Sequence, residues 1–522
     1  LDALLERAGE IKQPKRRQTL IDHAEQIRLS RSLVLLDENT PIDFTIDDLE
    51  VRNPDADTLL GFLSEMEFRT LSKRVAEVLG REAPAIPDAP APAVADAPQV
   101  ADVPFDHSKY EQVSDAEALR VWLDRIYEVG YVAVDTETTG LNEMTAELVG
   151  VSLSVEAGQA CYIPLTHKAS RSDDLFGSDD LAPGQMPIEE ALQLLTPMLE
   201  DPAILKIGQN MKYDGKIFAQ LGITVAPIDD TMLMSYAMHA GLHGHGMDTL
   251  SERYLGHTPL PIKPLLGSGK SAVTFDKVPM EDAVPYAAED ADVTLRLWKL
   301  FKPQLHRAEV TKVYETLERP LVPVLAQMER SGILVDRDTL SRMSNAFAQK
   351  MAGLEADIHE LAGETFNVGS PAQLGEILFG KMGLEGGKKG KTGKYSTGAD
   401  VLEDLATEHE LARRVLDWRQ LSKLKSTYTD ALQDHVNAET GRVHTCYSIA
   451  GAATGRLAST DPNLQNIPIR SEEGRRIREA FVAPEGKVLV ALDYSQIELR
   501  ILAHIAQIDA LKEAFARGFD IH

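Results

Sequence analysis

Two absences limit what this chain can be. Only two cysteines occur in its 522 residues, Cys161 and Cys446, so it has neither a disulfide framework nor four thiolates for a structural zinc site. No apolar run approaches the roughly 18 residues that predict a transmembrane helix. These absences predict a protein of a reducing cytoplasm with no membrane partner.

Positive charge is also scarce. The 54 basic and 81 acidic residues give a net charge of −27. This balance argues against nucleic-acid binding over the whole surface, because phosphate neutralisation requires clustered Lys and Arg. Residues 413–425, however, carry five basic side chains against one acidic side chain. A local basic track is therefore available, and it comprises Arg413, Arg414, Arg419, Lys423 and Lys425.

The composition divides the chain into four segments. At roughly 100–200 residues per domain, its length predicts about three to five folded units. An Ala/Pro-rich run predicts a linker over 81–104, because such a run cannot bury a core. Residues 1–80 have helical periodicity, 105–305 alternate strand and helix signals, and 306–522 are helical before they return to strands. The chain starts without Met and ends abruptly, so we expect a fragment truncated at both ends.

Two carboxylates stand together where a short β-branched run, 131–135, ends. Asp135 and Glu137 are two positions apart, so in a strand both point to the same face. Adjacent carboxylates repel each other unless a cation lies between them, and oxygen ligands suit Mg²⁺ or Mn²⁺. Such a pair is common on protein surfaces, so it predicts a metal site only if further ligands join it.

Two further pairs supply such ligands. Asn210 and Asp214 are four positions apart, as are Tyr286 and Asp290, and this spacing predicts one face of a helix for each pair. Asp214 and Asp290, together with Asp135 and Glu137, give four carboxylates. A phosphodiesterase uses such a set to hold two metal ions about 3.5–4 Å apart. The phenol of Tyr286 could orient the attacking water.

These three motifs resemble the exonuclease motifs of the ribonuclease H-like 3′→5′ proofreading domains, and the first continues as Asp-Thr-Glu-Thr-Thr-Gly-Leu to Leu141. The resemblance implies two Mg²⁺ or Mn²⁺ ions per active site and single-stranded DNA 3′ ends as substrate. It also implies a wedge against the terminal base at Leu141 and a DNA contact at Asn210. The implied metal ligands are Asp135, Glu137, Asp214 and Asp290, and the implied catalytic residues are these four and Tyr286.

A second constellation begins with the hydrophobic run 488–492, which predicts a strand that ends at Asp493 and a helix from about Gln496 onward. The segment 488–500 resembles motif A of family A DNA polymerases. The resemblance implies that the Asp493 carboxylate and the backbone carbonyl of Tyr494 hold the two catalytic Mg²⁺ ions. It implies a steric gate at Glu498 that rejects a ribose 2′-hydroxyl. The implied nucleotide-binding residues are Gln496, Glu498 and His522.

Three upstream segments resemble the thumb and palm of the same family: 423–428, 454–457 and 461–468. A polymerase that accepts any sequence must contact phosphates and the minor-groove acceptors that every base pair offers. The side chains implied in DNA binding are donors of that kind, and they are Arg419, Lys423, Arg456, Gln465, Asn466 and Arg470.

The resemblance covers nearly the whole chain and implies a multidomain α/β and α+β fold. Residues 1–80 loosely resemble the helical C-terminal part of a 5′-nuclease domain, 105–305 a ribonuclease H-like 3′→5′ exonuclease domain, and 306–522 a helical thumb with a partial palm. The implied activity is DNA-directed DNA synthesis with proofreading, in replication and repair, by a monomer in the bacterial cytoplasm at the nucleoid. The implied partners are primer–template DNA and, for the full-length protein, deoxynucleoside triphosphates.

Two features depart from the family pattern. Residues 448–453 are mainly small or apolar where many relatives carry polar residues. The family's second catalytic carboxylate and its fingers helix have no match before His522, so we expect the exonuclease to be retained and the polymerase site to lack a part.

Two alternatives remain open. A free-standing RNA exonuclease of the ribonuclease D kind would share the four carboxylates and Tyr286 but would not need residues 461–468 or 493–498. A non-catalytic DNA-binding scaffold would have no reason to keep four mutually repelling carboxylates.

Overall fold

In a computed structural model the chain forms two compact units, Leu1–Ala93 and Val94–His522. The described residues are 2–11, 13–36, 54–66, 68–81, 103–169, 180–269, 272–390, 393–469 and 471–521. Most of the expected linker over 81–104 lies outside them, as do Arg470 and His522. Within these ranges, no helix combines the length and apolar character needed to cross a bilayer.

The first unit is helical, as its periodicity predicts. Its α-helices are α1 (Asp2–Glu6), α2 (Pro14–Asp22), α3 (Ala24–Val34), α4 (Ala56–Glu65) and α5 (Arg69–Leu79). The Asp55 side chain caps α4 by accepting the Thr58 N–H at 2.8 Å, and Gly80 ends α5 in the left-handed conformation that glycine allows. Leu60 and Leu63 of α4 are buried.

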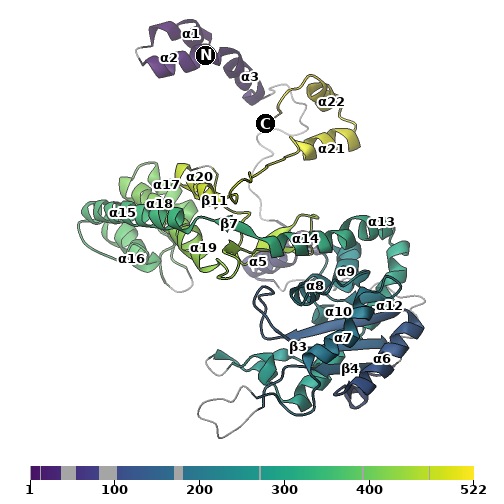
Figure 1. The fold of residues 1–522 in the computed structure, drawn as a ribbon. Helices are drawn as coiled ribbons and strands as arrows, with labels where there is room; N and C mark the ends of the chain where they lie inside the picture. The colour runs from purple at the N-terminus through teal and green to yellow at the C-terminus, as the bar shows by residue number, and fades with distance from the viewer. Residues whose placement is uncertain are drawn as a thin grey trace. The chain divides into compact units, whose positions relative to one another are not determined.

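The second unit begins with a six-stranded mixed sheet (Figure 1). Its strands are β1 (Glu111–Gln112), β2 (Tyr131–Thr138), β3 (Leu148–Glu156), β4 (Gln159–Pro164), β5 (Leu205–Gly208) and β6 (Ile228–Asp230). The spatial order is β1-β4-β3-β2-β5-β6, with β3 antiparallel to both β2 and β4 and the other pairs parallel. The strand that carries the predicted carboxylate pair, β2, therefore lies inside the sheet.

Seven helices accompany this sheet in the described part of residues 103–307. They are α6 (Ala116–Val129), α7 (Ile188–Glu200), α8 (Met211–Gln220), α9 (Thr231–His239), α10 (Met247–Tyr254), α11 (Ile262–Leu266) and α12 (Met280–Arg307). The longest, α12, packs across β2, β3 and β4. Its buried Ala287, Ala288 and Ala291 keep that contact close, because an alanine side chain needs little space.

The remainder of the second unit is mostly helical, with short strands. Its helices are α13 (Thr311–Val313), η7 (Tyr314–Glu318), α14 (Arg319–Ser331), α15 (Arg337–Ala362), α16 (Pro371–Gly375), η8 (Glu376–Lys381), α17 (Ala399–Ala406), α18 (Glu410–Leu424), η9 (Lys425–Asp430), α19 (Ala431–Asp434), α20 (Glu472–Ile477), η10 (Arg478–Ala480), α21 (Ile497–Ile505) and α22 (Asp509–Ala516). Its strands are β7 (Ile333–Val335), β8 (Arg442–Val443), β9 (Cys446–Ser448), β10 (Ala458–Thr460) and β11 (Phe481–Val482). Helices α15 and α18 lie side by side (Figure 1), and Leu340, Phe347 and Leu424 are buried in one core.

The strand predicted over 488–492 is wrong. The segment is not in a strand, and its large apolar side chains are exposed, from 56% at Leu489 to 94% at Leu492. A strand needs a neighbour to accept and donate its ladder hydrogen bonds, and the described residues offer this segment none. The helix predicted after it does form, from Ile497 to Ile505.

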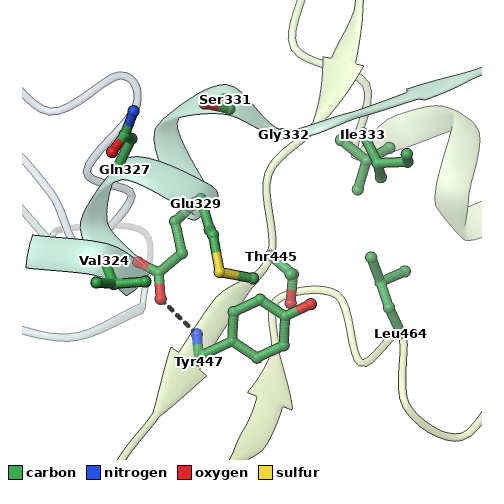
Figure 2. A pocket seen from close by; sticks show the side chains of 11 residues that line it. Val324, Gln327, Glu329, Ser331, Gly332, Ile333, Thr445, Tyr447 and Leu464 are labelled. Atoms are coloured by element: carbon green, nitrogen blue, oxygen red, sulfur yellow. Dashed lines mark hydrogen bonds between the residues drawn. The ribbon is translucent and has the colours of Figure 1, made fainter. Parts of the chain in front are cut away.

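A buried ion cluster joins α8 to α14 and to β9. The Glu329 carboxylate of α14 forms salt bridges with Lys212 and Lys216 of α8, and all three side chains are buried. It also accepts the Tyr447 N–H at 2.6 Å, at the edge of a cavity of about 450 Å³ (Figure 2). Lys216 reaches a second carboxylate, Glu143, at 2.7 Å. Glu329 therefore holds together elements that are more than a hundred residues apart in sequence.

We expect Glu329→Gln to destabilise the second unit by about 3–5 kcal/mol, because it leaves two buried ammonium groups without their shared counter-charge. Denaturant unfolding followed by circular dichroism measures this loss. Glu410→Gln is the matched control, since Glu410 pairs with Arg414 at an exposed site worth less than about 1 kcal/mol. Equal, small effects of the two variants would contradict the role given to Glu329.

Candidate active site

Three carboxylates meet at the junction of β2 and α12. Asp135 and Glu137 lie on β2, and Asp290 lies on α12. One oxygen of each lies within 4.8 Å of the others. The strand spacing of two and the packing of α12 across β2 bring them together, although Asp290 is far from the other two in sequence.

Asp214 approaches the same place from α8. Its Oδ1 accepts the backbone N–H of Thr136, the residue between the two strand carboxylates, at 3.1 Å. It is not among the three oxygens within 4.8 Å of one another. The structure therefore places three of the predicted ligands together and the fourth beside them.

Asn210 does not share a helical face with Asp214. It precedes α8 in the left-handed conformation, with φ 65°, and its N–H donates to Asp230 Oδ1 at 3.2 Å. Asp230 also accepts the N–H of Met211 at 2.9 Å. The predicted helix therefore starts one residue later, because a left-handed residue cannot continue a right-handed helix.

The electrostatics of the four carboxylates is unfavourable without a cation. Burial raises the pKa of Asp135 well above its usual range, and the neighbouring charges of Asp214, Asp290 and Glu137 raise it further. Burial also raises the pKa of Glu137 and of Asp290. Burial raises the pKa of Asp214 to about 7, although the hydrogen bonds from Thr136 act in the opposite direction.

An unsatisfied atom shows that this group suits a metal. Glu137 Oε1 is buried and has no hydrogen-bond partner. A buried polar atom normally has a partner, and a carboxylate oxygen without one is available as a ligand. The donors are all carboxylate oxygens, which hard divalent cations such as Mg²⁺ and Mn²⁺ prefer.

The phenol of Tyr286 stands one helical turn before Asp290 on α12. It is half-buried, and burial followed by the charge of Asp290 raises its pKa above the ordinary value. Tyr286 therefore keeps its proton at neutral pH and offers an O–H donor beside the carboxylates.

The sequence motifs did not identify Tyr213, which shapes the edge of this site. Its O–H donates to the Gly140 carbonyl at 2.6 Å and also contacts the Thr138 hydroxyl. These bonds fix the start of the loop that carries Leu141, whose side chain is 92% exposed. The sequence shows only that Tyr213 lies within the segment from Asn210 to Asp214. That position does not predict which residues its hydroxyl contacts.

The residues of the polymerase-like motif around Asp493 are more exposed than the carboxylate site. Asp493 and Tyr494 are exposed, and no cluster of potential metal ligands in the described ranges includes Asp493. Glu498 forms a salt bridge with Arg456 across 42 positions. The Gln496 side chain accepts the N–H of Ile521 at 3.1 Å.

Four of the predicted DNA-binding side chains fall into two groups. Lys423 and Asn466 line a groove of about 1030 Å³ between α18, η9 and residues 459–468. Arg419 and Gln465 instead bond to the protein. The Arg419 guanidinium donates to the Thr397 hydroxyl at 3.1 Å, and Gln465 accepts and donates backbone hydrogen bonds at 3.0 Å.

Comparison with known proteins gives two family matches. Residues 110–306 match the family described as 3′-5′ exonuclease, and residues 337–522 match the one described as DNA polymerase family A. Neither match includes residues 1–109 or 307–336.

Curated relatives cover the whole chain. It is 49% identical to a DNA polymerase I of Rhizobium leguminosarum, over 100% of this chain and 57% of the relative. It is 43% identical to a DNA polymerase I of Pseudomonas aeruginosa, over 96% of this chain and 53% of the relative. The chain thus spans a little over half the length of these relatives.

A solved structure has the same fold over most of the chain. It is described as the POL domain of Pol1 from M. smegmatis in complex with DNA primer-template and dNTP. The TM-score is 0.63 at 31% identity, and the match covers 79% of this chain and 65% of that one.

The raised carboxyl pKa values predict a pH dependence of metal binding. Below about pH 7, Asp214 holds a proton that a cation must displace, so the affinity for Mn²⁺ should rise by about tenfold per pH unit for each proton displaced. Calorimetric titration between pH 6 and 8 measures this slope. In metal-free protein the folded state binds these protons more tightly than the unfolded one, so stability should fall as the pH rises from about 4 to about 7.

Asp214→Asn is the matched variant for this slope, because it keeps the shape of the side chain and removes one titrating group. A Mn²⁺ affinity that stays flat from pH 6 to 8 in the parent protein would contradict the assignment.

Proposed function

This chain belongs to DNA polymerase family A and carries a 3′-5′ exonuclease domain, and from that premise we propose that it removes nucleotides from the 3′ ends of single-stranded DNA. The observation that carries the proposal is the meeting of Asp135, Glu137 and Asp290 within 4.8 Å, with Glu137 Oε1 left without a partner. In the full-length protein this activity would proofread a DNA-directed DNA polymerase that acts in replication and repair.

Each residue of the site has a distinct part. Asp135, Glu137 and Asp290, with Asp214 beside them, would hold two Mg²⁺ or Mn²⁺ ions. When bound, such ions supply an activated water and stabilise the leaving oxygen. Tyr286 keeps its phenolic proton, and its O–H, beside Asp290, would orient the attacking water.

The substrate end of the site is apolar. Leu141 is exposed on a loop that Tyr213 fixes at Gly140, so it can stack against the terminal base without first being ordered. Asn210, next to α8, is exposed and can contact the strand that enters.

The polymerase part would bind primer–template DNA in the groove lined by Lys423 and Asn466. Asp493 and the Tyr494 carbonyl would hold the ions of synthesis, and Gln496 would contact the incoming deoxynucleoside triphosphate. Glu498, which pairs with Arg456 in this chain, would be the gate that faces the sugar. An RNA exonuclease of the ribonuclease D kind would leave this part, residues 337–522, without a role.

The double substitution Asp135→Ala with Glu137→Ala should reduce degradation of single-stranded DNA to background, because it removes two of the three converging ligands. Gel analysis of an end-labelled oligonucleotide with Mg²⁺ measures the loss, and circular dichroism shows whether the fold persists. Glu147→Ala, an exposed carboxylate near the same loop, is the control and should leave degradation unchanged. Continued digestion by the double variant would overturn the assignment.

We expect this 522-residue chain to bind a primer–template without extending it. In-line phosphoryl transfer needs carboxylates on both sides of the metal pair, and Asp493 has no such partner among the described residues. Binding through Lys423 should weaken as the salt concentration rises. Primer extension with all four nucleotides, on an Asp135→Ala background that prevents degradation, is the measurement. Template-directed elongation would show that Asp493 suffices.

A further inference from the structure

A buried carboxylate next to the active site has two histidine partners. Glu289 precedes Asp290 on α12, and its side chain is 1% exposed. Its Oε1 lies 2.7 Å from His107 Nε2 and 2.7 Å from His257 Nε2. Its Oε2 accepts the Leu260 N–H at 2.6 Å. Residues 182 positions apart thus meet at one oxygen.

The charge of Glu289 is not balanced by a Lys or Arg salt bridge in the described part of the chain; its two ion-pair partners there are the histidines. The guanidinium two turns further along α12, Arg296, bonds to Asp292 at 2.9 Å. A carboxylate this buried is costly unless a positive charge compensates it. A metal ion between the three groups would supply that charge.

The donor set suits a borderline metal ion. Two imidazole nitrogens and one carboxylate oxygen, all within 4.8 Å of one another, are typical Zn²⁺ ligands, whereas the site of Asp135 and Glu137 offers oxygens only. With metal–ligand distances of about 2.0–2.1 Å, ligands of a tetrahedral ion lie about 3.3 Å apart. The present contacts would therefore open by roughly half an ångström around the ion.

The histidines are oriented and accessible. Phe105 stacks on His257 at a ring separation of 3.6 Å, with Arg296 3.8 Å over the Phe105 ring, so the His257 imidazole is held in place. The side chains of His107 and His257 are 37% and 20% exposed, so an ion can reach them from solvent.

We propose that His107, His257 and Glu289 form a binding site for one Zn²⁺-class transition-metal ion, separate from the carboxylate site on the same helix. The ion would tie the 3-10 turn η4 (His107–Lys109) and the segment after α10 to α12. Its role follows from that placement: it fastens two peripheral segments to the helix that carries Asp290.

The test uses the whole chain with Asp135→Ala, which weakens metal binding at the carboxylate site. After chelator treatment, the protein is titrated with Zn²⁺ in excess Mg²⁺ by calorimetry, and Co²⁺ serves as a spectroscopic probe. We expect one equivalent of Zn²⁺, a four-coordinate Co²⁺ absorption spectrum, and a rise of a few degrees in the thermal midpoint.

His107→Ala is the decisive variant, because its partly exposed side chain can be removed without opening the core. It should lower Zn²⁺ affinity by at least about 100-fold and abolish the thermal shift. His243→Ala is the matched control, since its ring lies in a separate histidine group with His245, and it should bind Zn²⁺ like the parent. The absence of a Zn²⁺ equivalent, unchanged binding by His107→Ala, or loss in His243→Ala instead would each overturn the proposal.

Discussion

Mutual repulsion between closely spaced, partly buried carboxylates is the constraint on which the exonuclease domain depends. Asp135, Glu137 and Asp290 converge within 4.8 Å, and each raises the cost of ionising its neighbours. A fold that needed only stability would bury apolar groups at this place. The position of β2 inside the sheet and the alanine-rich contact of α12 instead force the acids together, and this makes a cation the natural completion of the site.

A second electrostatic device connects this domain to the polymerase part. Lys212 and Lys216 lie on α8, the helix that carries Asp214, and both bind Glu329 on α14. Glu329 also accepts the N–H of Tyr447 on β9. The helix of a candidate metal ligand is therefore anchored directly to the segment that precedes the predicted palm. Breaking this cluster would disturb both parts of the unit at once.

The sequence predicted the site better where spacing alone decides geometry. A separation of two in a strand correctly placed Asp135 and Glu137 on one face, and the helical segments around Asp214 and Asp290 formed as expected. The predictions of local structure failed where a contact with a distant residue determines the backbone conformation. Asn210 lies outside α8 because its N–H bonds to Asp230, and 488–492 is not a strand because no neighbour pairs with it.

Long-range contacts could not be predicted from spacing at all. Glu329 meets Lys212 across 117 positions, and His107 meets Glu289 across 182. Neither pair forms part of a local motif, so only the packing of α8 and α12 reveals them. The DNA-binding predictions show the same limit, since the types of Arg419 and Gln465 suggest free donors while their surroundings already engage them.

Electron paramagnetic resonance of the Mn²⁺-loaded protein tests the central claim most directly. Two ions held by one carboxylate cluster, about 3.5–4 Å apart, are magnetically coupled. The account predicts a coupled two-Mn²⁺ spectrum in the parent protein and an uncoupled or absent signal after Asp290→Asn. A spectrum of isolated Mn²⁺ ions in the parent, unchanged by that substitution, would contradict it.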